Sequence, residues 1–169
     1  MKENSEIYMR HALSLAEIAL QKNEVPVGAI IVQRSTGEII GKGYNQRESV
    51  RHALAHAELI AIDEACRTLG GWRLPDCALY VTLEPCPMCA GAIIQSRIDE
   101  VYFGASDSKS GAVISVEHMF SLPYNYRPKI YNGVLEQECS AILSNFFRDL
   151  RIKRKQEKPV KKLQNYINN

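Results

Sequence analysis

The sequence predicts an α/β fold of three layers, with helices on both faces of a central, mixed sheet of roughly five strands. Segments with the pattern of strands alternate along the chain with segments of helical periodicity, which favours a layered α/β architecture. One pair of strands joined by a short turn adds an antiparallel return. The length of 169 residues, with 46% hydrophobic and 24% charged residues, fits one globular domain. We therefore expect a single domain over residues 1–169, with a basic C-terminal helix and tail from about residue 147 onward.

The N-terminal part of the chain predicts a helix, a strand pair and a second helix. Apolar residues at intervals of four, three and four predict an amphipathic helix over residues 5–22. Residues 25–32 are nearly all apolar, as expected for a strand that is covered on both faces. Residues 34–38 have the composition of a turn, and residues 39–44 that of the return strand. The next helix is expected at about 55–69, because a Gly-Gly pair follows it.

The C-terminal part predicts three further strands and two further helices. The strands are expected at residues 78–83, 101–103 and 129–131. Pro87 suits the first turn of a helix that runs to about residue 96. Residues 104–128 are rich in loop formers, with a possible short helix near 115–120. Apolar residues at intervals of four, three, four and four predict a long helix over residues 135–150.

Composition and termini indicate a cytoplasmic protein without a membrane segment. The N-terminal stretch MKENSEIYMR is polar and lacks the apolar core of a signal peptide. No apolar run approaches the roughly 18–20 residues that span a bilayer. The five cysteines are an odd number without a secretory signal, which argues against a disulfide framework and for free thiols in a reducing compartment.

Positive charge is concentrated near the C-terminus. The formal net charge is +2, but residues 148–162 hold eight basic and two acidic residues, a net charge of +6. The remainder, with 13 basic and 17 acidic residues, carries −4. A basic segment on a mildly acidic body predicts a polyanionic partner, and a solvated terminus explains the same charges equally well. The basic residues are Arg148, Arg151, Lys153, Arg154, Lys155, Lys158, Lys161 and Lys162.

Two short motifs predict a catalytic zinc site. HAE begins one predicted helix with His56 and Glu58, and PCPMC places Cys86 and Cys89 three residues apart at the start of another. One imidazole and two thiolates leave a fourth position on Zn²⁺ exchangeable, as in catalytic rather than structural zinc sites. Glu58 is two residues from His56 and therefore on another face, which suits a proton-transferring carboxylate beside a water at the open position. This arrangement predicts hydrolysis.

A purely structural interpretation of these residues is the alternative. His56 could cap its helix, Glu58 could be a first-turn acid that favours the helix dipole, and the two cysteines could be a buried pair. Each interpretation is reasonable for one residue. All four residues together, at matching helix starts, favour the catalytic metal site.

At these residues the sequence resembles the zinc-dependent nucleobase deaminases, whose signature is H-x-E followed by P-C-x-x-C. The resemblance is narrower than that superfamily and covers roughly residues 5–155. Segments that resemble the bacterial tRNA-specific adenosine deaminases are EVPVGAI (24–30), GYN (43–45), AHAE (55–58), GWRL (71–74), TLEPCPMCAGA (82–92), FGASD (103–107) and FFRDLR (146–151). The chain departs from that family at residues 51–54, Arg-His-Ala-Leu, where the family often has an Asp-Pro-Thr-like stretch.

The resemblance implies a cytidine deaminase-like fold and a specific reaction. The wobble adenosine of a tRNA anticodon loop, in tRNA-Arg, would be deaminated to inosine with release of ammonia by a homodimer with one Zn²⁺ per subunit. Phe146 continues the apolar periodicity of its helix, so the neighbouring Phe147 is the better candidate for stacking on a base. The residues that the resemblance places against the RNA are Asn45, Val27, Asp107, Lys109, Asn125, Phe147, Arg148 and Arg151.

Two rival functions remain open from the sequence. A zinc deaminase for a free base or nucleotide, such as cytosine, guanine or deoxycytidylate, would use the same four motif residues. The FFRDLR segment with its basic extension speaks for RNA, because a small-molecule enzyme would not require it. A nucleic-acid-binding protein with a structural zinc would need a fourth protein ligand. The spacing of the motifs does not choose between adenine and cytosine.

Overall fold

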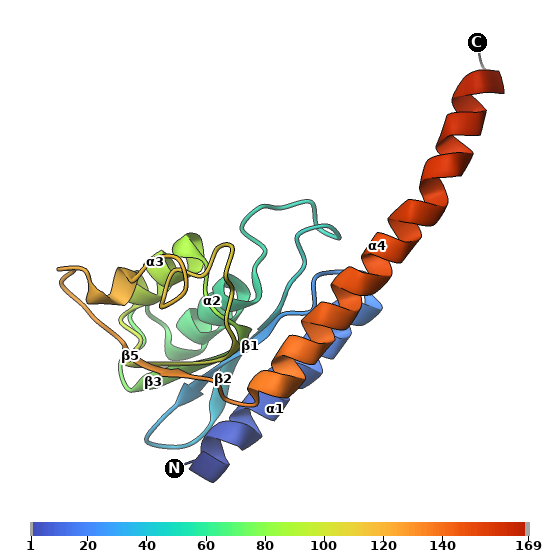
Figure 1. The fold of residues 1–169 in the computed structure, drawn as a ribbon. Helices are drawn as coiled ribbons and strands as arrows, with labels where there is room; N and C mark the ends of the chain where they lie inside the picture. Colours follow the sequence, from blue (N-terminus) through green and yellow to red (C-terminus); the bar gives the residue numbers. More distant parts are fainter. Residues whose placement is uncertain (1, 168–169) are drawn as a thin grey trace.

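A mixed sheet of five strands in the order β2-β1-β3-β4-β5 forms the centre of the computed structural model (Figure 1), which describes the backbone of residues 2–167 and the side chains of residues 4–156. β1 pairs antiparallel with β2 and with β3, whereas β3, β4 and β5 run parallel. The strands are β1 (Gly28–Gln33), β2 (Ile39–Tyr44), β3 (Cys77–Leu83), β4 (Glu100–Ala105) and β5 (Lys129–Asn132).

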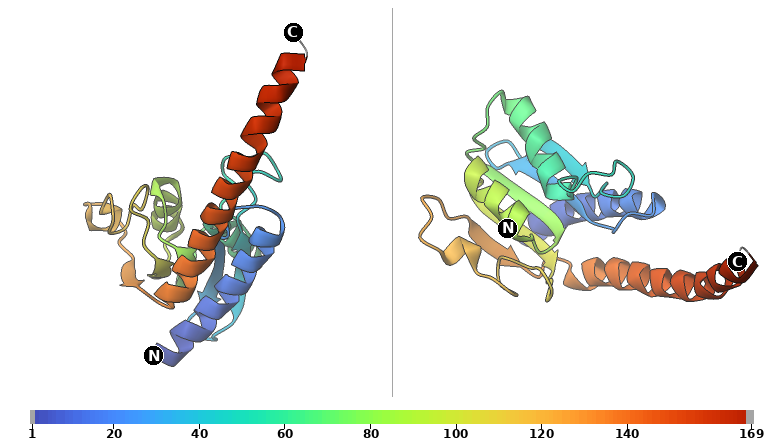
Figure 2. Two further views of the ribbon diagram at one scale, coloured as in Figure 1. Left: turned by 45° about the vertical axis from the view of Figure 1, so that its right-hand side comes forward. Right: turned by 90° about the horizontal axis from the view of Figure 1, so that it is seen from above.

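Four α-helices cover the two faces of this sheet, α2 and α3 on one face and α1 and α4 on the other (Figures 1 and 2). The helices are α1 (Lys2–Gln21), α2 (Ala57–Leu69), α3 (Pro87–Ser96) and α4 (Glu136–Ile167), with one 3-10 turn η1 (Met119–Ser121). The predicted three-layer α/β fold with a mixed, five-stranded sheet is confirmed.

Two glycines allow α1 and α4 to approach the sheet closely. A Cβ atom on Gly28 of β1 would lie 2.0 Å from the carbonyl oxygen of Ala12 in α1. A Cβ atom on Gly104 of β4 would lie 2.3 Å from the Sγ atom of Cys139 in α4. No side chain fits at either crossing, so the absence of a Cβ sets the distance of these helices from the sheet.

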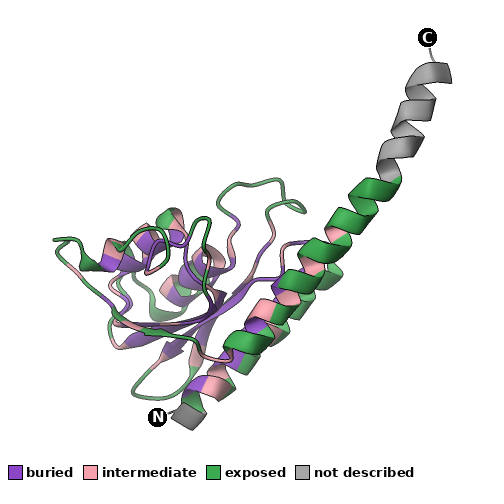
Figure 3. Ribbon diagram, viewed as in Figure 1, coloured by how far each residue is buried: buried purple, intermediate pink, exposed green. Residues whose placement is uncertain are grey.

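The main hydrophobic core lies between the sheet and helices α2 and α3. Leu79, Val81, Val101 and Phe103 point from β3 and β4 into this layer and are all fully buried. Burial decreases along α4, whose described side chains from residue 151 to 156 are all exposed (Figure 3). Within the described residues no helix is both long and apolar enough to cross a membrane. The side chains of Lys158, Lys161 and Lys162, part of the predicted basic segment, lie outside the described ones.

Several predicted boundaries differ from the structure, such as those of α1 (predicted 5–22) and β4 (predicted 101–103), and three differences have local reasons. The first strand begins at Gly28 rather than at residue 25. Pro26, which lacks an N–H group, lies in an irregular segment before it, where the N–H of Val27 donates to the carbonyl oxygen of Val25 at 2.8 Å. The short helix expected near 115–120 is a single 3-10 turn at Met119–Ser121. The last helix begins at Glu136, because Leu135 has a left-handed backbone conformation with φ of 51°.

The sheet topology gathers several chain segments at one edge. The carboxyl ends of the parallel strands β3 and β4 lie there together. β1 runs antiparallel to β3, so its start lies at the same edge, and Gly28 at that start pairs with Tyr44 at the end of β2. The segments that follow β2, β3 and β4 therefore meet around one place, as ligand sites in α/β proteins commonly do.

Candidate active site

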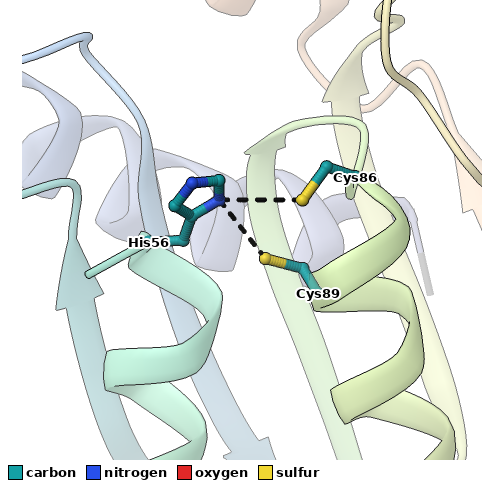
Figure 4. A group of neighbouring side chains, drawn as sticks. All are labelled: His56, Cys86 and Cys89. Carbon is teal, nitrogen blue, oxygen red and sulfur yellow. Dashed lines mark hydrogen bonds between the residues drawn. The ribbon is translucent and has the colours of Figure 1, made fainter. Parts of the chain in front are cut away.

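His56, Cys86 and Cys89 form a compact group at the starts of α2 and α3 (Figure 4). The Nδ1 atom of His56 lies 3.7 Å from the Sγ atom of Cys86 and 3.5 Å from that of Cys89. The three ligand atoms all lie within 4.8 Å of one another. The two motifs that are 30 residues apart in sequence thus meet in space.

His56 and Cys86 occupy the same position on their helices. Each is the N-cap residue, with an extended backbone conformation (ψ of 148° and 171°), and neither side chain makes a capping hydrogen bond. Pro87 occupies the first turn of α3, where its fixed φ and missing N–H cause no loss. The structural alternative in which the His56 side chain caps α2 is therefore wrong. Both side chains point past the helix ends toward each other (Figure 4).

The spacing of the group fits a tetrahedral zinc ion. With Zn–S bonds of about 2.3 Å and Zn–N bonds of about 2.0 Å, tetrahedral angles separate sulfur from nitrogen by about 3.5 Å. The observed separations of 3.5 and 3.7 Å match this value. A soft donor set of two sulfurs and one imidazole suits zinc. The side chains are thus arranged as a tetrahedral metal ion requires.

The protonation of the group fits a metal site as well. A hydrogen bond from Cys89 and contact with His56 lower the pKa of the Cys86 thiol to about 4. The pKa of Cys89 is raised, because it shares its proton with Cys86 and is buried. The pKa of His56 is raised through its contact with Cys86. One thiolate is therefore present at neutral pH, and a bound metal would displace the remaining proton.

Glu58 lies in the first turn of α2 and is only 4% exposed. Burial raises the pKa of its carboxyl group to about 7, while its own backbone N–H and nearby His56 oppose the shift. A carboxyl group with a pKa near the working pH exchanges protons in both directions. Glu58 is thus placed beside the His-Cys-Cys group in a state suited to acid–base chemistry.

A cavity of about 670 Å³ opens over this group. Both His56 and Cys86 reach it, whereas Cys89 is fully buried and absent from its lining. The residues predicted to meet substrate that do line the cavity are Val27, Asn45, Asp107, Lys109, Phe147 and Arg151. They come from the residue before β1, the residue after β2, the segment after β4 and helix α4. The sheet edge and α4 together therefore form the walls.

Two predicted contact residues lie elsewhere. Asn125 accepts a hydrogen bond of 2.8 Å from Arg97, the residue after α3, at the opposite end of that helix from the His-Cys-Cys group. Arg148 is exposed on α4 beside Asp149 at 3.5 Å. Neither is among the described residues that line the cavity.

Phe146 and Phe147 differ in burial, as the helical periodicity predicts. Phe146 is half-buried, and Phe147 is 41% exposed and lines the cavity. Their rings contact each other edge to face at 5.3 Å.

The sequence reasoning missed several residues that line the cavity. Arg47 brings a positive charge to the cavity two residues after Asn45. Its position just after a predicted strand could have indicated that it lies near the site. Leu143 and Ser144 lie one turn before Phe147 on α4, so helical spacing could have found them. Glu84 also lines the cavity and directly precedes the Pro-Cys motif.

A buried carboxylate also holds Asn45 in place. The side-chain amide of Asn45 donates to the Oε2 atom of Glu24 at 3.4 Å. The same carboxylate accepts the backbone N–H groups of Glu48 at 3.2 Å and Ser49 at 2.6 Å. Glu24 is fully buried, so the loop after β2 is fixed from inside the protein.

The mixed sheet and the paired helix starts, with an imidazole, two sulfurs and a neighbouring carboxylate, form the arrangement expected of a nucleobase deaminase. Residues 3–151 match the family model of the MafB19-like deaminases, and the chain belongs to this family. The resemblance noted in the sequence is thereby confirmed.

Individual proteins with a named substrate are similar to this chain. A tRNA-specific adenosine deaminase of Bacillus subtilis (strain 168) is 48% identical over 151 residues, 89% of this chain and 92% of that protein. A structure solved in a study of A-to-I editing by tRNA:A34 deaminases at the wobble position of transfer RNA superposes with a TM-score of 0.77 and 44% identity, covering 80% of this chain and 98% of that one. The guanine deaminase of Nitrosomonas europaea gives a TM-score of 0.69 at 25% identity, covering 83% of each chain.

Proposed function

We propose that this protein is a zinc-dependent hydrolase that deaminates the wobble adenosine of a tRNA anticodon loop to inosine and releases ammonia. The observation that carries the proposal is the His-Cys-Cys group with Glu58 beside it, at a cavity whose lining includes residues of α4. The similarity over nine-tenths of the chain to a tRNA-specific adenosine deaminase supports the choice of substrate.

In this proposal His56, Cys86 and Cys89 hold one Zn²⁺ per subunit. When bound, zinc polarises a water molecule and lowers its pKa to about 7, which supplies a nucleophile at neutral pH. Among the described residues, only these three form such a group of potential metal ligands. Three protein ligands leave a position open for water and substrate, which speaks against a purely structural zinc.

Glu58 moves the protons of the reaction. It accepts a proton from the attacking water and delivers this proton to N1 of the adenine ring. It then accepts the proton of the new hydroxyl group on C6 and passes it to the amino group, which leaves as ammonia while the C6 carbonyl of inosine forms. Its side chain is only 4% exposed and lines the cavity, so it can be reached from the side on which the substrate binds. One carboxylate serving as base and then as acid accounts for the absence of a second acid in the motifs.

The substrate base must leave its stack to reach the cavity floor, which costs least in a single-stranded loop. Val27 and Asn45 wall the inner part of the cavity, where the base would bind. Asp107 and Lys109 form the rim on the side of β4, and Phe147 and Arg151 the rim on α4, where an aromatic ring and a cation suit flanking nucleotides.

Further parts of the proposal concern the partners of the enzyme. We infer tRNA-Arg as the substrate and a homodimer as the active state on the basis of the sequence resemblance. We infer the cytoplasm as the location because the cysteines are free thiols. The predicted contacts of Asn125 and Arg148 with RNA belong to this part as well, because the cavity of one chain does not include them.

The rival function is deamination of a free base, which the similarity to a guanine deaminase favours. The same metal group and Glu58 would perform that reaction. Helix α4 distinguishes the two functions, because it brings an exposed phenylalanine and an arginine to the cavity. It continues with the exposed basic side chains of Lys153, Arg154 and Lys155. A free base offers nothing for these residues to bind.

Parallel rate measurements test the proposal against its rival. The zinc-loaded protein is assayed on an anticodon stem-loop RNA with a wobble adenosine, on free adenosine and on guanine. We expect inosine in the RNA at a kcat/KM that exceeds both other values by several orders of magnitude. Rapid deamination of guanine with no inosine in the RNA would establish the rival function instead.

A further inference from the structure

Glu84 is a buried carboxylate that binds the loop after β4. It lies directly after β3, is 2% exposed and reaches the cavity. Its Oε1 atom accepts the backbone N–H groups of Val113 at 3.1 Å, Ile114 at 2.8 Å and Ser115 at 2.9 Å. Its Oε2 atom accepts the backbone N–H of Asp107 at 3.0 Å and the hydroxyl of Ser115. Five donors from one loop thus converge on a single side chain.

The loop is built around this carboxylate. A Cβ atom on Gly111 would lie 2.3 Å from the Cδ atom and 2.4 Å from the Oε2 atom of Glu84, so a glycine is needed there. The backbone N–H of Ala112 donates to the carbonyl oxygen of Pro85 at 2.9 Å, which is a second link between the same two segments.

Asp107 extends the link to the cavity rim. Its carboxylate accepts the backbone N–H groups of Lys109 at 2.9 Å and Ser110 at 3.3 Å, as well as the hydroxyl of Ser110 at 2.6 Å. Residues 106–110 all line the cavity. Glu84 therefore connects the rim to the chain segment that carries Cys86, two residues further on.

We propose that Glu84 is a positioning residue for the nucleic-acid substrate, which fixes the rim loop (residues 106–115) relative to the metal group. The inference rests on the proposed function, in which this rim meets the nucleotides that flank the target base. Glu84 itself touches neither metal nor reacting atoms in this role. Its effect is on the place where the loop holds Asp107 and Lys109.

The kinetic signature of this role is a change in KM. The flanking nucleotides contact the rim equally in the bound substrate and in the transition state, so loss of the contact weakens both by the same amount. Such uniform binding affects KM and leaves kcat unchanged. A residue needed for metal binding or for proton transfer would lower kcat instead.

The test compares Glu84→Gln with Glu100→Gln in the zinc-loaded protein. Glu100 is also a buried acid on a neighbouring strand, at 9% exposure, but it pairs with Arg34 at 3.1 Å, away from the rim. An amide retains the size of the side chain and replaces one acceptor oxygen with a donor, which faces N–H groups of the loop. Zinc content, kcat and KM on the stem-loop RNA, and amide hydrogen exchange of residues 106–115 are measured for each variant.

We expect Glu84→Gln to retain one zinc per chain and a kcat within twofold of the wild type. KM for the RNA should rise by at least about tenfold, which corresponds to 1.4 kcal/mol. Amide exchange in residues 106–115 should become at least about tenfold faster, whereas Glu100→Gln should leave KM and this exchange unchanged. Unchanged KM, loss of zinc or a drop in kcat alone would overturn the inference.

A milder variant covers the case that Glu84→Gln does not fold. Ser115→Ala removes one of the five donors and keeps the carboxylate, so KM should rise about two- to tenfold, the equivalent of 0.5–1.5 kcal/mol. An unchanged KM together with unchanged exchange in the rim loop would refute the role of Glu84. If the wild-type protein forms no inosine in RNA while Glu84→Gln still accelerates exchange of the loop, the proposed substrate is wrong, and with it this role toward nucleic acid.

Discussion

Replacing Glu58 by glutamine separates the proton-transfer role from metal binding. Glutamine has the same size as glutamate and fits the buried place in the first turn of α2, but it accepts no proton. The His-Cys-Cys group is unchanged in this variant, so we expect one zinc per chain, as in the wild type.

The size of the effect follows from the burial of the side chain. General acid–base catalysis contributes roughly 10²–10⁴-fold to a rate. Glu58 serves several proton transfers, and its side chain is only 4% exposed, so few other groups can take over these transfers. We therefore expect kcat to fall by at least about 10³-fold, or about 4 kcal/mol of barrier height, with little change in KM.

Single-turnover deamination of the stem-loop RNA, with zinc measured on the same samples, provides the assay. Asp63→Asn is the matched control, because Asp63 is on the same helix with a side chain that is 63% exposed and pairs with Arg67 on the surface. That variant should react at the wild-type rate. A zinc-loaded Glu58→Gln protein with a rate within tenfold of the wild type would refute the assigned role.

Three further predictions concern metal binding, packing and substrate contact. Zinc affinity should fall by about tenfold or more for each unit of decreasing pH, because the raised pKa values of His56 and Cys89 leave protons that the metal must displace. A chelator competition series from pH 8 to 6 measures this dependence. A constant zinc affinity over this range would contradict the prediction. Gly104→Ala should lower the unfolding free energy by about 1–3 kcal/mol, because the added Cβ clashes with α4. The control Gly71→Ala, with nothing within 4 Å of the added Cβ, should leave the Tm of thermal unfolding unchanged. Equal Tm values for the two variants would show that α4 does not pack tightly at Gly104. Phe147→Ala should weaken RNA binding by about 1–3 kcal/mol through lost stacking and leave stability unchanged, and an unchanged KM would remove this ring from the substrate site.

The sequence predicted the fold because its local signals agree. The apolar run of the first strand, the helical periodicity and the Gly-Gly pair after α2 each indicate the element that forms. The His-Cys-Cys group was predictable because the HAE and PCPMC motifs each include the N-cap of a helix, and the fold only has to bring the two helix starts together. Boundaries at Gly28 and Glu136 were less predictable, because a proline and one left-handed residue decide them.

The walls of the cavity were harder to predict from the sequence. Arg47 and Ser144 lie on segments that are distant in sequence and meet only through the sheet topology. The role of Glu84 depends on backbone donors of residues 107–115, which no residue pattern specifies. Asn125 was predicted to contact the RNA from the family resemblance alone. The resemblance did not show that Asn125 lies beside Arg97, away from the cavity of its own chain.

Zinc titration of the metal-free protein tests the central claim most directly. Metal is removed with a chelator, Zn²⁺ is returned in steps, and the rate of inosine formation in the stem-loop RNA is measured at each step. The rate should be negligible without metal, rise in proportion to bound zinc and reach its maximum at one ion per chain. Full activity in the metal-free protein would contradict the assignment of His56, Cys86 and Cys89 and the chemistry built on it.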